Sequence, residues 1–81
     1  MSYFVYILEC ADGTLYCGST NDVERRLTAH NGLKSGAKYT RSRRPVTLMH
    51  TEEFKTASEA KKREAEIKGK TREEKLQLFN A

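Results

Sequence analysis

Two stretches near the N-terminus are rich in aliphatic, aromatic and β-branched residues and flank a turn signal. These stretches are residues 5–10 and 14–20, and Asp12 and Gly13 lie between them. Strands favour such residues, and an Asp-Gly pair between two of them is a strong hairpin signal. The pattern therefore predicts a β-hairpin at the start of the chain.

The remaining elements follow from helical and alternating spacing. We expect a helix over residues 22 to about 30, a strand over 46–54, a helix from 57 to 68 and a short helix from 72 to 79. Each helix opens on a capping pattern: Asn21 with Glu24, Thr56 with Glu59, and Thr71 with Glu74. Val46, Leu48 and His50 are expected to share one face of the third strand, and Gly69 is expected to act as a C′ residue.

The element order β-β-α-β-α-α defines the expected fold class. It predicts an α/β (α+β) domain with a small three-stranded, mostly antiparallel sheet flanked by helices. A chain of 81 residues has room for one modest core, and no repeat or linker divides it, so residues 1–81 are expected to form a single domain.

The register of the hairpin decides which face each tyrosine occupies. A two-residue turn would place Tyr6 and Tyr16 on opposite faces, because side chains alternate along a strand. A three-residue connection with Gly13 in the left-handed conformation places both on one face, with Gly18 opposite Tyr6 and Leu8 opposite Tyr16. We predict the three-residue connection, since Asp followed by Gly suits the bulged turn.

Composition narrows the function classes only slightly. Apolar residues make up 37% of the chain and charged residues 32%, which is typical of a small globular protein. The net charge of +4 favours an anionic partner, although many small proteins without one carry such a charge. Cys10 and Cys17 fit no zinc pattern and fall on opposite faces of the bulged hairpin, so both are expected to be reduced. Without a leader or a membrane-spanning run, the chain is expected to be cytoplasmic.

The hairpin and the helix after it together resemble the GIY-YIG endonuclease superfamily, in particular its small single-domain bacterial branch. The two tripeptides that name the superfamily correspond to Phe4-Val5-Tyr6 and Tyr16-Cys17-Gly18. The superfamily's helix arginine falls on Arg26, its frequent helix histidine on His30 and its metal-binding glutamate on Glu64. The first tripeptide begins with phenylalanine instead of glycine, and the second has cysteine in place of an aliphatic residue.

The resemblance implies a nuclease that uses Mg²⁺ or another divalent cation. The site residues that it implies are Tyr6, Tyr16, Gly18, Arg26 and His30 for catalysis and Glu64 for the metal. A guanidinium can stabilise phosphate charge, and Mg²⁺ often binds a single carboxylate while keeping several waters. One tyrosine would take a proton from water or orient it, and the sequence leaves open which. A phenol is a poor base at neutral pH, and Arg26 and a metal ion placed close by are expected to lower its pKa.

Each of these residues also has a structural explanation. Arg26 could be one of several exposed helix arginines, and His30 could interact with its helix dipole. Glu64 lies in a charge-rich helix that would normally be a solvated face, and Gly18 could relieve a close packing contact. The spacing of the whole set favours the catalytic interpretation.

A basic segment at residues 34–44, interpreted as a loop, supplies the expected nucleic-acid contacts. Its candidates are Lys34, Lys38, Tyr39, Arg41, Arg43 and Arg44. Cations suit phosphates and an aromatic ring can stack on a base, although an ordinary solvated loop has similar composition.

Three functional hypotheses remain at this stage. The first is hydrolysis of DNA that is selected by shape rather than by sequence, weak in the isolated chain and helped by a protein partner. The second is a nucleic-acid-binding module of the same fold with little or no catalysis. The third is a protein-interaction domain whose basic loop meets an acidic partner. No membrane partner is expected.

Overall fold

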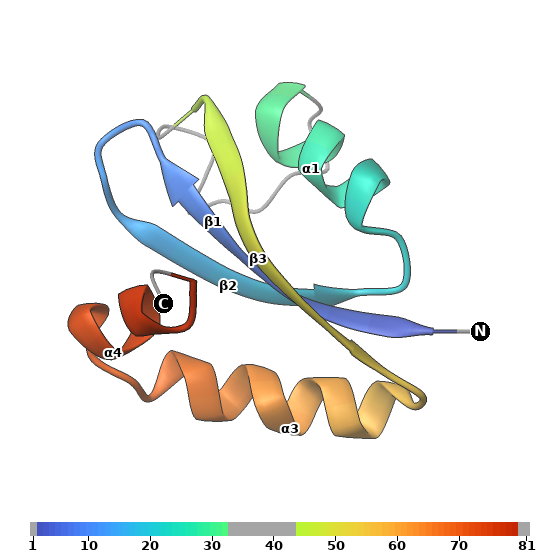
Figure 1. Ribbon diagram of the computed structural model, residues 1–81. Helices are drawn as coiled ribbons and strands as arrows, with labels where there is room; N and C mark the ends of the chain where they lie inside the picture. The colour runs from blue at the N-terminus through green and yellow to red at the C-terminus, as the bar shows by residue number, and fades with distance from the viewer. Residues whose placement is uncertain (1, 33–43, 80–81) are drawn as a thin grey trace.

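The structure of the protein, a computed structural model, describes residues 2–32 and 44–79. Its elements follow the order β-β-α-β-α-α and confirm the expected α+β fold class (Figure 1). They are β1 Tyr3–Cys10, β2 Leu15–Thr20, α1 Val23–Gly32, β3 Val46–Phe54, α3 Ala57–Lys68 and α4 Arg72–Gln77. The sheet is antiparallel with the strand order β2-β1-β3, so β2 and β3 form its edges. No helix in this part of the chain is long and apolar enough to cross a membrane.

The hairpin between β1 and β2 has the predicted three-residue connection. The backbone N–H of Cys10 donates to the Thr14 carbonyl at 2.8 Å, and Gly13 adopts a left-handed φ of 84°. Tyr6 therefore pairs with Gly18, and Leu8 pairs with Tyr16. This register confirms that the two tyrosines share one face of the sheet.

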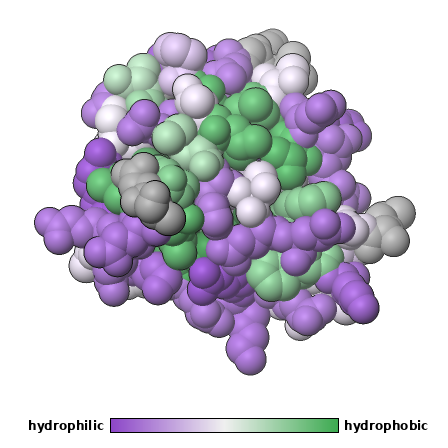
Figure 2. Space-filling model, in the orientation of Figure 1, coloured by the Kyte–Doolittle hydropathy of each residue, from purple (hydrophilic) through white to green (hydrophobic). Residues whose placement is uncertain are grey.

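The sheet has a core on each face. Tyr6, Leu8, Cys10 and Val46 are buried on the face that α1 covers, called the α1 face below. Val5, Ile7, Cys17, Ala60 and Ile67 are buried on the opposite, α3 face, which α3 and α4 cover (Figure 1). Because the two buried cysteines lie on opposite faces, they do not form a disulfide, as predicted. Figure 2 shows hydrophilic side chains dominating the lower part of this view, where α3 lies.

The helix starts follow the predicted caps with one correction. The Thr56 side chain accepts from the Glu59 N–H, and Thr71 and Glu74 form a complete capping box. In α1, however, the carboxylate of Asp22 rather than Asn21 accepts from the Arg25 N–H, at 3.1 Å. Asparagine and aspartate are both good N-cap residues, and in this structure Asp22 occupies the N-cap position of α1.

Gly69 and the third strand depart from expectation. Gly69 ends α3 in a right-handed conformation with φ of −79°, so it does not take the left-handed role expected of it. In β3, Leu48 pairs with Leu8 but His50 pairs with the adjacent Ile7, which leaves Met49 as an extra residue in a bulge. Leu48 therefore stays on the α1 face, whereas His50 turns to the α3 face.

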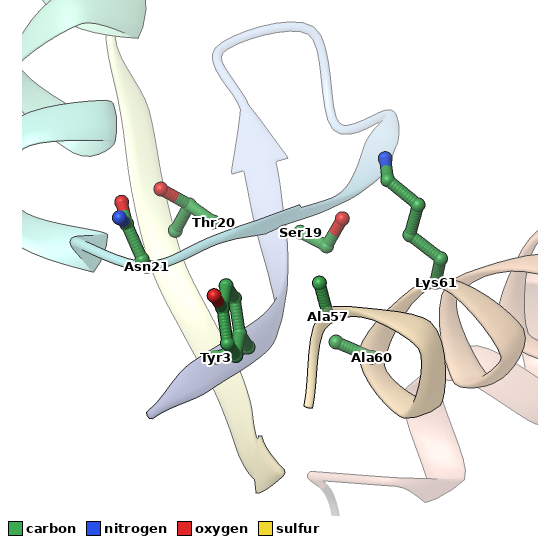
Figure 3. A pocket seen from close by; sticks show the side chains of 7 residues that line it. All are labelled: Tyr3, Ser19, Thr20, Asn21, Ala57, Ala60 and Lys61. Atoms are coloured by element: carbon green, nitrogen blue, oxygen red, sulfur yellow. The ribbon is translucent and has the colours of Figure 1, made fainter. Parts of the chain in front are cut away.

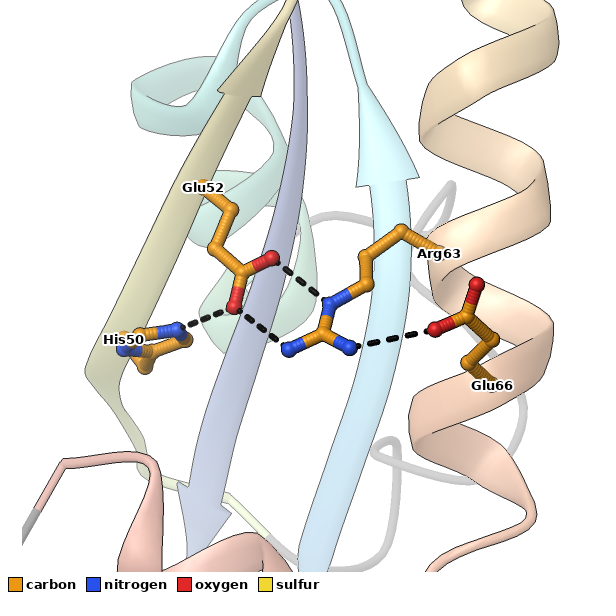
Figure 4. A network of polar contacts seen from close by, with 4 residues as sticks. All are labelled: His50, Glu52, Arg63 and Glu66. Carbon is orange, nitrogen blue, oxygen red and sulfur yellow. Dashed lines mark hydrogen bonds and ion pairs between the residues drawn. The ribbon is translucent and has the colours of Figure 1, made fainter.

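This bulge places His50 in a polar network that connects β3 to α3 (Figure 4). The Arg63 guanidinium donates to both oxygens of Glu52, at 2.7 and 3.1 Å, and to Glu66 at 3.2 Å. His50 Nε2 lies 2.8 Å from Glu52 Oε2. The bonds from Arg63 hold the pKa of Glu52 below its ordinary value although burial opposes them. The network thus connects α3 to β3, while the next residue of the helix, Glu64, hydrogen-bonds to Ser19 of β2.

Candidate active site

Three aromatic side chains from three elements form a cluster on the α1 face. Tyr6 comes from β1, Tyr16 from β2 and His30 from the last turns of α1. The Tyr6 hydroxyl oxygen lies 3.0 Å from His30 Nε2, and the Tyr16 and His30 ring centres are 5.2 Å apart. Tyr6 is 2% exposed and His30 is fully buried. The structure thus brings together three of the predicted site residues and adds a specific contact between two of them.

Gly18 permits this arrangement because it lies directly beneath the Tyr6 ring. An added Cβ at this position would lie 2.5 Å from the Tyr6 hydroxyl oxygen and 2.7 Å from Cζ. Real Cβ atoms essentially never approach other atoms so closely, so any side chain would displace the ring. Gly18 therefore relieves a close packing contact, as one explanation expected, and the residue that it accommodates is the site residue Tyr6.

Arg26 lies one helical turn before His30, and its charge lowers the pKa values of both Tyr6 and His30. Burial raises the pKa of Tyr6 above its ordinary value, and this outweighs the hydrogen bond and charge of Arg26, which lower it. Arg26 therefore acts on this pKa in the expected direction, although its effect is smaller than that of burial. Burial, Arg26 and Arg44 all lower the pKa of His30. The imidazole is consequently neutral at pH 7, and with its proton on Nδ1 it can accept the Tyr6 hydroxyl hydrogen.

Glu64 approaches from the opposite face of the sheet, at the edge strand β2. Burial would raise the pKa of its carboxyl, but hydrogen bonds from Lys68 and Ser19, with the charges of Lys68 and Lys61, lower it. Lys68 Nζ lies 2.7 Å from Glu64 Oε2. The charge of Glu64 also raises the pKa of Tyr6, so the two groups are within electrostatic reach. The predicted metal ligand therefore lies at the β2 edge on the α3 side of the sheet, bonded to Lys68 and Ser19, and not on the α1 face with the aromatic cluster.

The chemistry around Glu64 suits a hard divalent cation. A carboxylate and the Ser19 hydroxyl offer oxygen atoms, and Mg²⁺ needs few protein ligands. Among the described residues, no group of three or more histidine, cysteine, aspartate or glutamate side chains could hold a metal ion. The Lys68 ammonium already places a cation on the carboxylate, so a metal ion there would have to displace it.

The expected nucleic-acid contacts fall largely outside the described residues. These are Lys34, Lys38, Tyr39, Arg41 and Arg43. Arg44 is described, and its Nε donates to the His30 carbonyl at 2.7 Å, next to the helix end. Asn31 also connects α1 to β3, because its side chain accepts from the Val46 N–H and donates to the Val46 carbonyl.

Sequence reasoning missed Ser19 and Lys68, the two partners of Glu64. Lys68 follows Glu64 by four residues, a spacing at which helix side chains meet, so this contact could have been predicted from the sequence. The sequence indicated the position of Ser19 less strongly. Adjacent residues of a strand point to opposite faces, so Ser19 must face α3 if Gly18 faces α1. Nothing local indicated that α3 packs beside that edge.

Comparison with known proteins gives a consistent result. A family model described as the GIY-YIG catalytic domain matches residues 2–77, from β1 through α4. The UPF0213 protein of Syntrophus aciditrophicus is 59% identical over 76 residues, which are 94% of this chain and 87% of that protein. The UPF0213 protein of Halobacterium salinarum is 54% identical over 77 residues, covering 95% and 99% of the two chains.

Two solved structures are also similar. The solution NMR structure of a protein from E. faecalis matches with a TM-score of 0.67 at 51% identity, covering 99% of this chain and 84% of that one. The solution NMR structure of the UPF0213 protein from Bacillus halodurans gives a TM-score of 0.62 at 46% identity, with the same two coverages. These comparisons confirm the resemblance noted in the sequence.

Proposed function

The chain belongs to the GIY-YIG nuclease family, and on that premise we propose that it hydrolyses DNA phosphodiester bonds with a divalent cation such as Mg²⁺. The observation that carries the proposal is the 3.0 Å contact between the buried Tyr6 hydroxyl and His30 Nε2. A tyrosine with a neutral imidazole behind it can pass on a proton, which an isolated phenol of raised pKa does poorly. The net charge of +4 supports a polyanionic substrate recognised by backbone and shape.

Each site residue has one role in this proposal. The Arg26 guanidinium binds the non-bridging oxygens of the scissile phosphate and stabilises the charge that develops on them. The Tyr6 hydroxyl accepts a proton from the attacking water while donating its own to His30. The water oxygen bonds to phosphorus, and the bond from phosphorus to the sugar oxygen breaks. The sugar oxygen leaves with the bonding electrons and takes up a proton from solvent, and His30 afterwards releases its extra proton to solvent. A divalent cation held by Glu64 would supply Lewis-acid stabilisation of the negative charge.

A second candidate is a DNA-binding module with little or no turnover. The Lys68–Glu64 contact at 2.7 Å favours it, because this ion pair occupies the only carboxylate assigned to the metal. The net charge would then serve binding alone. Both the nuclease and the DNA-binding module are expected to act with a protein partner that presents the DNA.

Cleavage assays separate the two candidates. Purified protein is incubated with supercoiled and branched DNA, with Mg²⁺ or with chelator, beside Tyr6→Phe, Arg26→Ala and Glu64→Ala proteins that are checked for folding. Loss of a proton-transfer or charge-stabilising group should slow cleavage by roughly 100-fold or more.

The matched control is Arg25→Ala, which removes an exposed arginine from the same helix and should leave the rate unchanged. Cleavage that persists in all three site variants would contradict the assignment. DNA binding without cleavage by the unaltered protein would establish the module instead.

A further inference from the structure

A small pocket opens beside the candidate site, on the α3 side of the β2 edge (Figure 3). Its volume is about 180 Å³, and it lies between the start of β1, the end of β2 and the first turns of α3. Tyr3 contributes one aromatic wall, and Ala57 and Ala60 contribute an apolar one. Ser19, Asn21 and Lys61 add polar groups and a positive charge.

The pocket lies next to Glu64, the proposed metal ligand, and residues of both β2 and α3 connect the two. Ser19, which lines the pocket, also hydrogen-bonds to Glu64. Lys61 lies three residues before Glu64, about 4.5 Å along the helix axis. Successive nucleotides of one DNA strand are about 3.4 Å apart along a duplex. A phosphate beside Glu64 would therefore place the neighbouring nucleoside at this pocket.

The lining has the chemistry that a nucleobase requires. The Tyr3 ring and the exposed Ala57 methyl group can contact the faces of a planar ring above the buried Ala60, while hydroxyl and amide groups can bond to its edge. Lys61 is exposed and can approach the phosphate of the same nucleotide. The volume is below the roughly 300–1,000 Å³ of drug-sized sites, which suits one base better than a larger ligand.

We infer that this pocket is a subsite for the base next to the scissile phosphodiester. The inference rests on the proposed nuclease function for its substrate, but base binding needs no cleavage and can be measured separately. Tyr3 contacts the face of the base, Ser19 and Asn21 bond to its edge, and Lys61 binds the adjoining phosphate. The subsite aligns the DNA strand with Glu64.

The test is a methyl-detected NMR titration in chelator with a thymidine pentanucleotide as the probe. The alanine methyl signals of Ala57 and Ala60 should shift and saturate, whereas those of Ala29 on α1 and of Ala65 on the exposed side of α3 should not. Replacing one thymidine with an abasic residue should weaken binding about tenfold at one position of the strand and abolish the Ala57 shift. Phosphate contacts alone would leave the abasic strand with unchanged affinity and would overturn the inference.

Matched substitutions give a second readout. Ala57→Leu fills the pocket from an exposed helix position and should weaken pentanucleotide binding about tenfold, while Ala65→Leu should not. Lys61→Gln should weaken binding more than Lys62→Gln. Thermal unfolding checks that each variant is folded.

These outcomes distinguish the subsite from the proposed function. Cleavage that is unaffected by Ala57→Leu, with unshifted Ala57 and Ala60 signals, would refute the subsite and leave the nuclease standing. Base binding in the pocket of a protein that never cleaves DNA would refute the nuclease and leave the subsite standing.

Discussion

Replacing Gly18 with alanine tests the contact on which the candidate site depends. The added Cβ would lie 2.5 Å from the Tyr6 hydroxyl oxygen and 2.7 Å from Cζ. Tyr6 is 2% exposed and its hydroxyl contacts His30, so the ring cannot move away without breaking that bond. Overpacking of this kind costs about 1–3 kcal/mol. For a domain of this size each kcal/mol lowers the Tm by about 4–8 °C.

Thermal and urea unfolding followed by circular dichroism measure this cost. The matched control is Gly69→Ala, where the nearest atom to an added Cβ is 3.5 Å away and φ is −79°. This variant should be as stable as the parent or slightly more stable, because alanine restricts the unfolded chain.

A double-mutant cycle shows whether the cost of Gly18→Ala comes from Tyr6. Tyr6→Leu removes the atoms that the new methyl group would meet, so Gly18→Ala should cost at least about 1 kcal/mol less in that background. An equal cost in both backgrounds, or a Gly18→Ala protein as stable as the parent, would refute the reasoning.

Three further predictions concern polar groups around the sheet. Lys68→Gln should raise Mn²⁺ affinity several-fold in calorimetry, because its ammonium no longer competes for Glu64. The lowered pKa of His30 means that the unfolded chain takes up the proton first, so stability should fall as the pH drops below about 6.5. His30→Gln should flatten that part of the urea-stability curve. Arg63→Lys should cost about 1 kcal/mol in urea unfolding, since lysine cannot form both bonds to Glu52.

Each of these has a result that contradicts it. Mn²⁺ affinity that is the same in Lys68→Gln and in the control Lys62→Gln would exclude competition at Glu64. An unchanged pH dependence in His30→Gln would show that the buried imidazole is not the responsible group. An Arg63→Lys protein that is as stable as the parent would show that the two-bond contact to Glu52 adds nothing beyond the positive charge.

Local sequence chemistry was enough to predict the hairpin and its consequences. The Asp12-Gly13 pair is compatible with two turns but favours the three-residue connection, and the register of that connection places Tyr6 opposite Gly18. The caps of α3 and α4 were equally local, since each depends on side chains three residues apart. The bulge at Met49 was not predictable in this way, because it depends on how β3 pairs with β1 across the sheet.

The site shows the same division between local and tertiary information. The spacing of Arg26 and His30 predicted that they share one helix face, and the family resemblance implied that this face meets the tyrosines. The approach of Glu64 around β2 depends on how α3 packs, which no local pattern encodes. The pKa of Tyr6 depends on a balance between burial and the charge of Arg26, and only the folded structure shows that burial dominates.

The central claim is that Tyr6 transfers a proton during metal-dependent cleavage of DNA. Single-turnover cleavage of a labelled branched DNA by the unaltered protein and by Tyr6→Phe tests it most directly. We expect cleavage that requires the divalent cation and is at least about 100-fold slower in Tyr6→Phe, with DNA affinity retained. Equal rates in the two proteins would contradict it.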